Sequence, residues 1–354
     1  MTRSVTLDAL DRRLIHALQL DGRAPLSRIA AVLGAPERTV ARRYHRLRSA
    51  FVVRVVGLVD GARAGLLDWF VRIDCAPDAV DALASALAAR DDTSWIAPLA
   101  GGSRLVCMVR TPAVAADGGR ALFDHLARTP GVRNLEANCV LRPVAGVGGW
   151  AGRTSALEAA EQALLRSWAV TEGVDDADPD MDGAAEWTEA DARLIGELAR
   201  DGRAEVRDLA AVTGWSASTV RRRIARLRVT GVLHFEVDVD PALFGSPVEA
   251  LLWLEVAPGA LRTVTGTLSR HPQVAFAAVT TGSASVFAMV QCRDTGALYD
   301  YLAHELGALY DYLAHELGAL PGIGRTETAL VQRRAKRAGA LLAPASRPRN
   351  ARRA

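Results

Sequence analysis

Apolar residues recur every three or four positions in two stretches that begin near residues 10 and 190, and this period predicts amphipathic helices. The first helix ends at Asp21 and Gly22, and a second short helix follows Pro25. Gly34 then makes the turn to a third helix over about residues 36–50. The apolar positions of these helices are Leu10, Leu14, Ile15, Leu18, Ile29, Ala30, Leu33, Val40, Tyr44 and Leu47. Two short helices joined by a glycine turn, with a support helix before them, are typical of a helix-turn-helix unit.

The same pattern occurs twice in the chain. The letters DRRLIHALQLDGRA at 11–24 correspond to DARLIGELARDGRA at 191–204, an offset of 180 positions. This offset holds without a gap between residues 7–60 and 187–240, where roughly 23 of the 54 aligned positions are identical, far more than chance would give. The sequence therefore predicts two copies of one unit.

The second part of each copy alternates short strand-like and helical segments. In the first copy, DWFVRIDC, TSWIAPLAG and SRLVCMVR are strand-like, and DAVDALASALAAR has the period of an amphipathic helix. The order strand, helix, strand, strand, helix, strand is typical of a ferredoxin-like fold. We therefore predict an α+β protein with two winged helix-turn-helix domains and two ferredoxin-like βαββαβ domains in tandem.

Composition shifts suggest where these domains begin and end. The predicted ranges are 1–60 and 187–245 for the helix-turn-helix domains, 65–145 and 247–335 for the ferredoxin-like domains, 146–186 for a linker, and 336–354 for a basic tail that we expect to be disordered. Within the linker, Leu157, Ala160, Leu164 and Trp168 lie on one stripe and predict a helix packed on a neighbour.

A short exact duplication lies in the second ferredoxin-like region. The letters GALYDYLAHEL at 296–306 recur unchanged at 307–317. Because eleven residues make close to three helical turns, the apolar face stays aligned. We therefore predict one long helix from about Thr295 to Ala319.

Positive charge is concentrated on the third helix of each copy. The whole chain has 43 Lys+Arg and 40 Asp+Glu, a net charge of +3, so a uniformly basic surface is excluded. The cations of these two helices are Arg38, Arg42, Arg43, His45, Arg46 and Arg48 in the first copy, and Arg221, Arg222, Arg223, Arg226 and Arg228 in the second. Arginine suits DNA because its planar guanidinium binds a phosphate, or the O6 and N7 atoms of guanine, through two hydrogen bonds. A solvated basic face is the alternative interpretation, and the recurrence of the same face at the same offset favours DNA.

We therefore predict that both third helices bind double-stranded DNA with their N-terminal residues nearest the bases. Thr188 and Ser216 are placed to cap the first and third helices of the second copy. The predicted DNA-binding residues are Arg38, Thr39, Arg42, Arg43, Arg46, Ser216, Ser218, Thr219, Arg221, Arg222, Arg223 and Arg226. Because the two helices differ at most of their first positions, we expect an imperfect palindrome as the operator.

Several other classes of protein are not favoured. The four cysteines, Cys75, Cys107, Cys139 and Cys292, lie far apart, so a zinc site, an iron–sulfur site and a disulfide framework are not expected. No nucleophile triad, metal-ligand spacing or phosphate-binding loop occurs, so we expect no enzyme activity, no metal and no cofactor. No apolar run reaches the ~20 residues of a membrane helix, and the N-terminus lacks the apolar core of a signal peptide. The expected location is the cytoplasm, away from membranes.

The quoted segments resemble one known family. LDALDRRLIHALQLDGRA and WTEADARLIGELARDGRA, followed by IAAVLGAPERTVARRYHRL and LAAVTGWSASTVRRRIARL, are similar to the helix-turn-helix segments of the Lrp/AsnC family of bacterial transcription regulators. The resemblance implies DNA binding through the third helix, dimerisation through the ferredoxin-like domain, and in many members an amino acid effector near the turn between its second and third strands. Members usually carry one copy, so this chain would supply both halves as a covalent pseudo-dimer, with further self-association through the ferredoxin-like domains.

The effector turn departs from the family pattern. Amino-acid-binding members tend to carry acidic residues just after the glycine of that turn, and neither copy has a carboxylate there to bind an ammonium group. A free amino acid is therefore not favoured. A different small-molecule effector would meet Gly101, Ser103, Arg104, Gly282, Ser283 and Ser285, and the alternative is that these are plain turn residues.

Two other functions fit the same layout. Siroheme decarboxylases resemble it and are expected to use histidines and arginines of the ferredoxin-like part, where this chain has the scattered His125, His271, His304 and His315. An architectural DNA-binding protein with little sequence preference is the second alternative, and the basic tail supports it.

Overall fold

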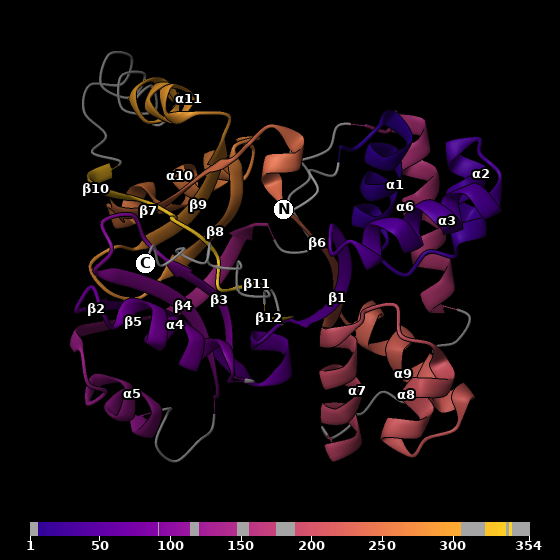
Figure 1. Ribbon diagram of the computed structural model, residues 1–354, viewed down its shortest axis with the longest axis horizontal. Coiled ribbons are helices and arrows are strands. Elements are labelled where there is room, and N and C mark those ends of the chain that lie inside the picture. Colours follow the sequence, from indigo (N-terminus) through magenta and orange to yellow (C-terminus); the bar gives the residue numbers. More distant parts are fainter. Residues whose placement is uncertain are drawn as a thin grey trace, which may run out of the picture.

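The computed structural model describes residues 6–90, 92–113, 120–146, 156–174, 188–305, 323–337 and 340–341. Two lobes are visible, one made of helices around a two-stranded ribbon and the other of a large antiparallel sheet with helices on its faces (Figure 1). Each copy contributes its helix-turn-helix unit to the first lobe and its ferredoxin-like unit to the second. The predicted fold class is confirmed.

The helical lobe holds two three-helix units joined by a strand pair. The strand after each third helix pairs antiparallel with its counterpart, from Val53 opposite Val239 to Val59 opposite Leu233. One continuous apolar core runs through both units. Its elements are α1 (Ala9–Leu20), α2 (Leu26–Leu33), α3 (Glu37–Ser49), β1 (Val53–Val59), α7 (Glu189–Arg200), α8 (Val206–Thr213), α9 (Ala217–Val229) and β6 (Leu233–Val239).

The helix ends follow from local residues. Asp8 accepts a hydrogen bond from the Asp11 N–H, and the Asp11 carboxylate accepts one from the Asp8 N–H, which forms a capping box at the start of α1. Thr188 and Asp191 do the same for α7. Gly34 ends α2 with φ +62°, a left-handed conformation that glycine adopts without strain. These caps set the start of the support helices α1 and α7 and the end of α2, which precedes the recognition helix α3. Helix α9 is the recognition helix of the second unit.

The second lobe contains two βαββαβ units. The first is β2 (Leu66–Cys75), α4 (Val80–Ala88), β3 (Thr93–Pro98), β4 (Arg104–Pro112), α5 (Arg120–Ala127) and β5 (Val132–Ala145). The second is β7 (Val248–Val256), α10 (Leu261–Leu268), β8 (Val274–Thr280), β9 (Val286–Cys292), α11 (Thr295–Asp300) with a π-helical turn at Tyr301–Glu305, and β10 (Ile323–Leu330). Short 3-10 turns at Ala62–Ala64, Pro241–Phe244 and Pro258–Ala260 connect the parts.

The inner faces of the two units pack against each other. Phe70 of the first copy stacks on Phe287 of the second with ring centroids 3.7 Å apart, and Trp253 lies beside them. Strand β5 also pairs with β8 of the other copy. Near the other edge, the Ala100 N–H donates to the Leu330 carbonyl. The two copies are therefore joined by an apolar core and at both sheet edges.

The linker contains a helix, although its buried stripe differs from the predicted one. Helix α6 (Ala159–Val174) packs against α1, α2 and α9. Leu157 and Leu165 are buried, whereas Ala160 is exposed and Leu164 is 44% exposed, so the placement of these two residues on the buried stripe was wrong. Leu157 precedes the helix, and counting the helical period from it shifts the phase by one residue. The Trp168 side chain lies outside the described residues.

The start of the basic tail is ordered, which corrects the prediction of disorder from residue 336. Strand β11 (Lys336–Arg337) pairs with β3 opposite Ile96 and with β12 (Ala340–Leu341). Lys336 is buried, and its Nζ donates to the Arg90 carbonyl. Strand β3 lies at the edge of its unit, so its backbone N–H and C=O groups are available to pair with this segment. Residues 342–354 lie outside the described range, as does 306–322, which holds most of the predicted long helix.

Candidate nucleic-acid interface

Reciprocal contacts hold the two helix-turn-helix units together. The Arg23 guanidinium donates to the carbonyls of Gly202 and Ala204 at 2.7 and 3.2 Å. Arg203, at the same position in the second copy, donates to Gly22 and Ala24 at 2.7 and 3.0 Å. The ion pairs Arg48–Asp201 at 2.7 Å and Arg228–Asp21 at 3.1 Å repeat the same exchange. Burial lowers the pKa of Arg23 to about 10, so it stays charged at neutral pH.

Three of the predicted DNA-binding arginines form ion pairs inside their own unit. Arg43 and Arg46 bind the buried Asp11 at 2.9 and 2.5 Å, and Arg43 also binds Asp8. Arg223 binds Asp191 through two hydrogen bonds at 2.6 and 2.9 Å. These contacts fasten each recognition helix to the N-terminus of its support helix. Sequence reasoning missed them, although Asp11 and Asp191 occur at the same position of both copies.

Four exposed arginines of the recognition helices differ from the ion-paired ones. Arg38 and Arg42 are one turn apart on α3, and Arg221 and Arg222 lie on the second turn of α9. None of the four makes an ion pair with another described residue. They present full positive charges at the N-terminal halves of both helices, where phosphates or base edges are within reach of a long side chain.

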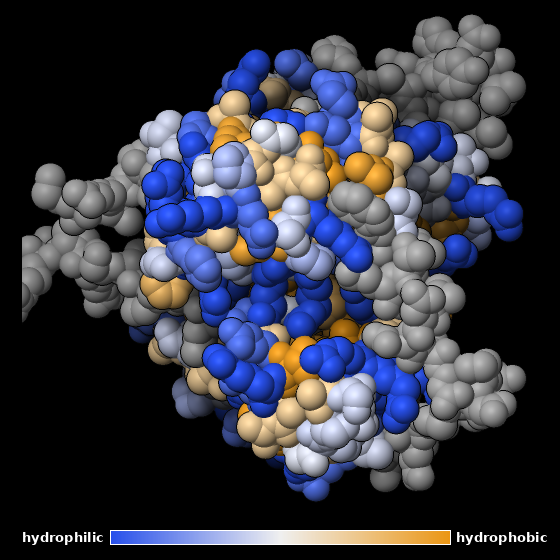
Figure 2. All heavy atoms as spheres, turned by 90° about the vertical axis from the view of Figure 1, so that its right-hand side faces the viewer, coloured by the Kyte–Doolittle hydropathy of each residue, from blue (hydrophilic) through white to orange (hydrophobic). Residues whose placement is uncertain are grey.

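The hydroxyl residues of α9 form a local cluster. Ser216 caps the helix by accepting a hydrogen bond from the Thr219 N–H at 3.1 Å, and its Oγ lies 2.8 Å from both Ser218 Oγ and Thr219 Oγ1. Thr39 takes the corresponding place on α3 and is half-buried, as is Arg226 on α9. Figure 2 looks onto the end of the molecule that carries these units and shows strongly hydrophilic residues gathered across its middle.

The structure does not bring the predicted effector residues into one site. The turn after β3 and the turn after β8 lie in different copies, and each contacts the other copy separately. Gly101 and Gly282 adopt φ +103° and +99°. The Ser103 carbonyl accepts from the Cys75 N–H, the Ser285 hydroxyl donates to the Val256 carbonyl at 3.1 Å, and Ser283 is exposed.

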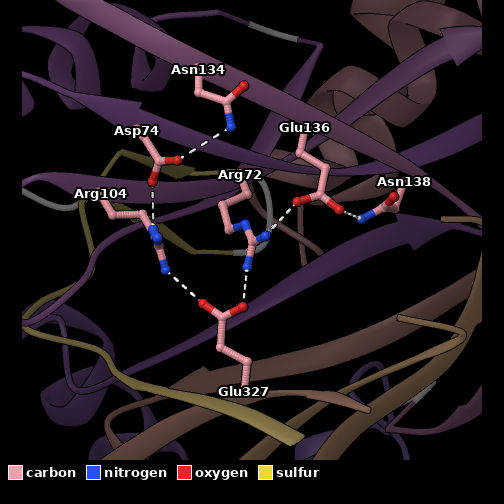
Figure 3. A network of polar contacts seen from close by, with 7 residues as sticks. All are labelled: Arg72, Asp74, Arg104, Asn134, Glu136, Asn138 and Glu327. Carbon is pink, nitrogen blue, oxygen red and sulfur yellow. Dashed lines mark hydrogen bonds and ion pairs between the residues drawn. The ribbon is translucent and has the colours of Figure 1, made fainter. Parts of the chain in front are cut away.

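Arg104 belongs instead to a charged network between the copies (Figure 3). Glu327 of β10 binds Arg104 at 2.7 Å and Arg72 at 2.8 Å, one through each carboxylate oxygen. Asp74 also binds Arg104, and Glu136 binds Arg72, at 2.6 and 2.5 Å. Burial raises the pKa of Glu327, but the two arginines outweigh this effect, so the pKa is lowered and the carboxylate stays ionised. The amides of Asn134 and Asn138 donate to Asp74 and Glu136.

The described residues include histidines and cysteines of the kind that catalysis or metal binding would use. No group of three or more His, Cys, Asp or Glu among them is placed to hold a metal ion. His125 is exposed on α5, and His271 in the other copy lies 3.1 Å from the Tyr301 hydroxyl. All four cysteines are buried, and burial raises the pKa of Cys107 to about 12, which suppresses its thiolate. Among the helices described, none combines the length and apolarity needed to cross a bilayer.

Comparisons with known proteins agree with the repeat. The chain matches the AsnC-type helix-turn-helix domain at residues 7–48 and 188–228, and the Lrp/AsnC ligand binding domain at residues 249–341. The HTH-type transcriptional regulator FL11 of Pyrococcus horikoshii is 27% identical over 144 residues, which are 40% of this chain and 87% of that protein. The HTH-type transcriptional regulator AldR of Mycobacterium tuberculosis is 30% identical over 126 residues, which are 34% of this chain and 70% of that protein.

The similarity to a solved structure can extend over both copies. The siroheme decarboxylase NirDL aligns with a TM-score of 0.57 at 13% identity, covering 94% of this chain and 94% of that chain. At this identity the similarity concerns the fold alone. It places both helix-turn-helix units and both ferredoxin-like units in one known architecture.

Proposed function

The chain belongs to the Lrp/AsnC family of transcription regulators, and from that premise we propose that it binds specific double-stranded DNA as a covalent pseudo-dimer. The observation that carries the proposal is the exposure of Arg38 and Arg42 on α3 and of Arg221 and Arg222 on α9. A regulator needs unpaired cations at the start of its recognition helix, because phosphates supply most of the affinity and base edges supply the specificity. The ion-paired Arg43, Arg46 and Arg223 then orient these helices.

The contacts between the copies support the pseudo-dimer. The β1–β6 pair and the exchanged arginines Arg23 and Arg203 are the kind of reciprocal contact that a two-fold dimer makes. Both DNA-binding units are thus present at equal concentration in every molecule, held in one relative orientation. Binding of one half-site then makes binding of the other intramolecular.

We further propose that the ferredoxin-like units respond to a small molecule other than a free amino acid, in the cytoplasm, and that chains associate through these units. The turns at Gly101 and Gly282 carry no carboxylate, and Arg104 is held between Asp74 and Glu327. A ligand at the first turn would therefore have to compete with an existing ion-pair network.

Binding to duplex DNA tests the proposal. A pool of short genomic duplexes should yield a subset bound at least a thousandfold more tightly than random duplex at the same salt concentration. Arg262→Ala on α10 removes one exposed charge far from the recognition helices and serves as a control for net charge. Binding with no preference among duplexes would favour the architectural function, and no binding at low salt would refute both.

Siroheme decarboxylation is the second candidate, because the likeness to NirDL spans both copies. Of the four histidines considered for such a reaction, His125 is exposed on α5 and His271 is half-buried after α10 in the other copy. The side chains of His304 and His315 lie outside the described residues. Incubation with siroheme separates the two functions. A changed absorption spectrum with release of carbon dioxide would favour the enzyme, and an unchanged spectrum would favour the regulator.

A further inference from the structure

Helix α6 joins the first helix-turn-helix unit to the recognition helix of the second. Leu157 just before the helix and Leu165 within it, 5% and 1% exposed, belong to the common apolar core of both units. His16 Nδ1 on α1 accepts hydrogen bonds from the backbone N–H groups of Ala156 and Leu157 at 3.2 and 3.1 Å. Arg13 binds Glu161 at 2.6 Å. The same helix packs against α9.

Comparison of α1 with α7, its counterpart in the second copy, shows which residues of α1 are specific to the contact with α6. His16 and Ala17 are buried on α1, whereas the residues at the same positions of α7, Gly196 and Glu197, are partly exposed. Leu20 likewise corresponds to Arg200. The first copy therefore has an apolar surface with one specific hydrogen-bond acceptor where the second has small and charged residues. Burial lowers the pKa of His16, which keeps its ring neutral and able to accept these bonds.

The two recognition helices also differ in burial at one corresponding position. Ala225 on the third turn of α9 is 7% exposed, whereas His45, at the same position of α3, is exposed. Helix α6 packs against α9, which carries Ala225, whereas His45 on α3 faces solvent. A small residue on α9 and a large polar one on α3 are what a covered and an open face require.

We propose that α6 makes the two recognition helices unequal readers of DNA, so that His45 and Arg221 determine specificity in one half-site each. The inference rests on the proposed function and deepens it. On α3, Arg38, Arg42 and His45 present polar side chains on three successive turns. On α9, Ser218, Arg221 and Arg222 present them on the first two turns, and the third is closed at Ala225.

The chemistry of the two faces also differs. The imidazole of His45 offers one donor and one acceptor to a base edge, whereas the methyl group of Ala225 offers neither. Conversely, the guanidinium of Arg221 stands where α3 has Ala41. The operator is therefore expected to have one longer half-site, read by α3, and one shorter half-site, read by α9, so that the protein binds in a single orientation.

Cysteine labelling tests the covered face directly. The four natural cysteines are buried, so they give a low background. We expect His45→Cys to react with a maleimide at least tenfold faster than Ala225→Cys. Loosening α6 with His16→Ala or Leu165→Ala should accelerate labelling of Ala225→Cys and leave His45→Cys unchanged. Equal rates at the two positions, or no response to either loosening variant, would overturn the inference.

Selection from a randomised duplex pool tests the reading itself. The wild-type chain should select half-sites of unequal length. His45→Ala should relax the base preference by at least fivefold at one edge of the longer half-site. Arg221→Ala should relax it by at least fivefold only in the shorter half-site. Two equal half-sites, or the same response of both halves to either variant, contradict unequal reading while leaving DNA binding intact. If no duplex is enriched, the proposed function fails and this inference fails with it.

Discussion

Arg23 and Arg203 occupy the same position in the two copies, and each donates hydrogen bonds to backbone carbonyls of the other copy. Arg23→Ala would leave the Gly202 and Ala204 carbonyls without this donor inside the helical lobe. Because hydrogen bonds to a charged group contribute about 1.5–3 kcal/mol, we expect the free energy of unfolding to fall by roughly that amount. Urea denaturation measures it. Arg207→Ala, at an exposed arginine of α8, is the control and should change little.

Arg42→Ala and Arg222→Ala should each weaken operator binding by roughly 1–3 kcal/mol if the guanidinium contacts a base, or lower the salt dependence of binding if it contacts a phosphate. Titration of a labelled operator at several salt concentrations distinguishes the two contacts. The fold should persist, because neither side chain makes an ion pair among the described residues. Wild-type affinity and salt dependence in both variants would rule out the assigned role.

Asp191→Asn should misplace α9. Burial raises the pKa of Asp191, but hydrogen bonds from Arg223 and Thr188 outweigh this effect and lower the pKa below its ordinary value of 3.8. A carboxyl group with a lowered pKa in the folded state contributes stability above its unfolded pKa and loses it as the pH falls through the folded pKa. Stability of the wild type should therefore decline below about pH 4, and the variant should show a smaller decline. Identical pH profiles in thermal unfolding would contradict this account.

Gly146→Ala should destabilise the contact between the ferredoxin-like units. Gly146 has φ +84°, and a Cβ there would lie 2.2 Å from the Ala275 carbonyl oxygen of the other copy. Gly101→Ala is the matched control, because Gly101 has φ +103° with nothing within 4 Å. We expect a cost of about 1–2 kcal/mol for the control from backbone strain alone, and roughly 3 kcal/mol or more for Gly146→Ala. Similar losses of stability in both variants would mean that the backbone around Ala275 shifts to accommodate the added methyl group.

The local features of the fold were predictable from the sequence, because they depend on residues close together along the chain. The period of Leu10, Leu14 and Leu18 and the turn at Gly34 predicted the helix-turn-helix, and the offset of 180 positions predicted its second copy. Strand and helix order in the second lobe followed from the same kind of pattern.

The partners of individual side chains were not predictable, because they come from distant parts of the chain. Arg43 and Arg223 were assigned to DNA, yet they face Asp11 and Asp191, about thirty residues away. Lys336 was assigned to a disordered tail, yet its strand completes an edge more than two hundred residues earlier. Arg104 was assigned to an effector turn, and its partner Glu327 comes from the other copy. Periodicity shows which face of an element is buried and leaves open which segment covers it.

The pairing of β5 with β8, and of the segment after β10 with β3, has a consequence for a cell that makes several regulators of this type. In a single-copy protein, subunits can exchange, and related subunits can form mixed pairs. Here the surface of each copy that would bind a second subunit is covered by the other copy of the same polypeptide. In the proposed pseudo-dimer, the two helix-turn-helix units are always partners within one polypeptide, so their combination is encoded by one gene and does not vary with the abundance of relatives.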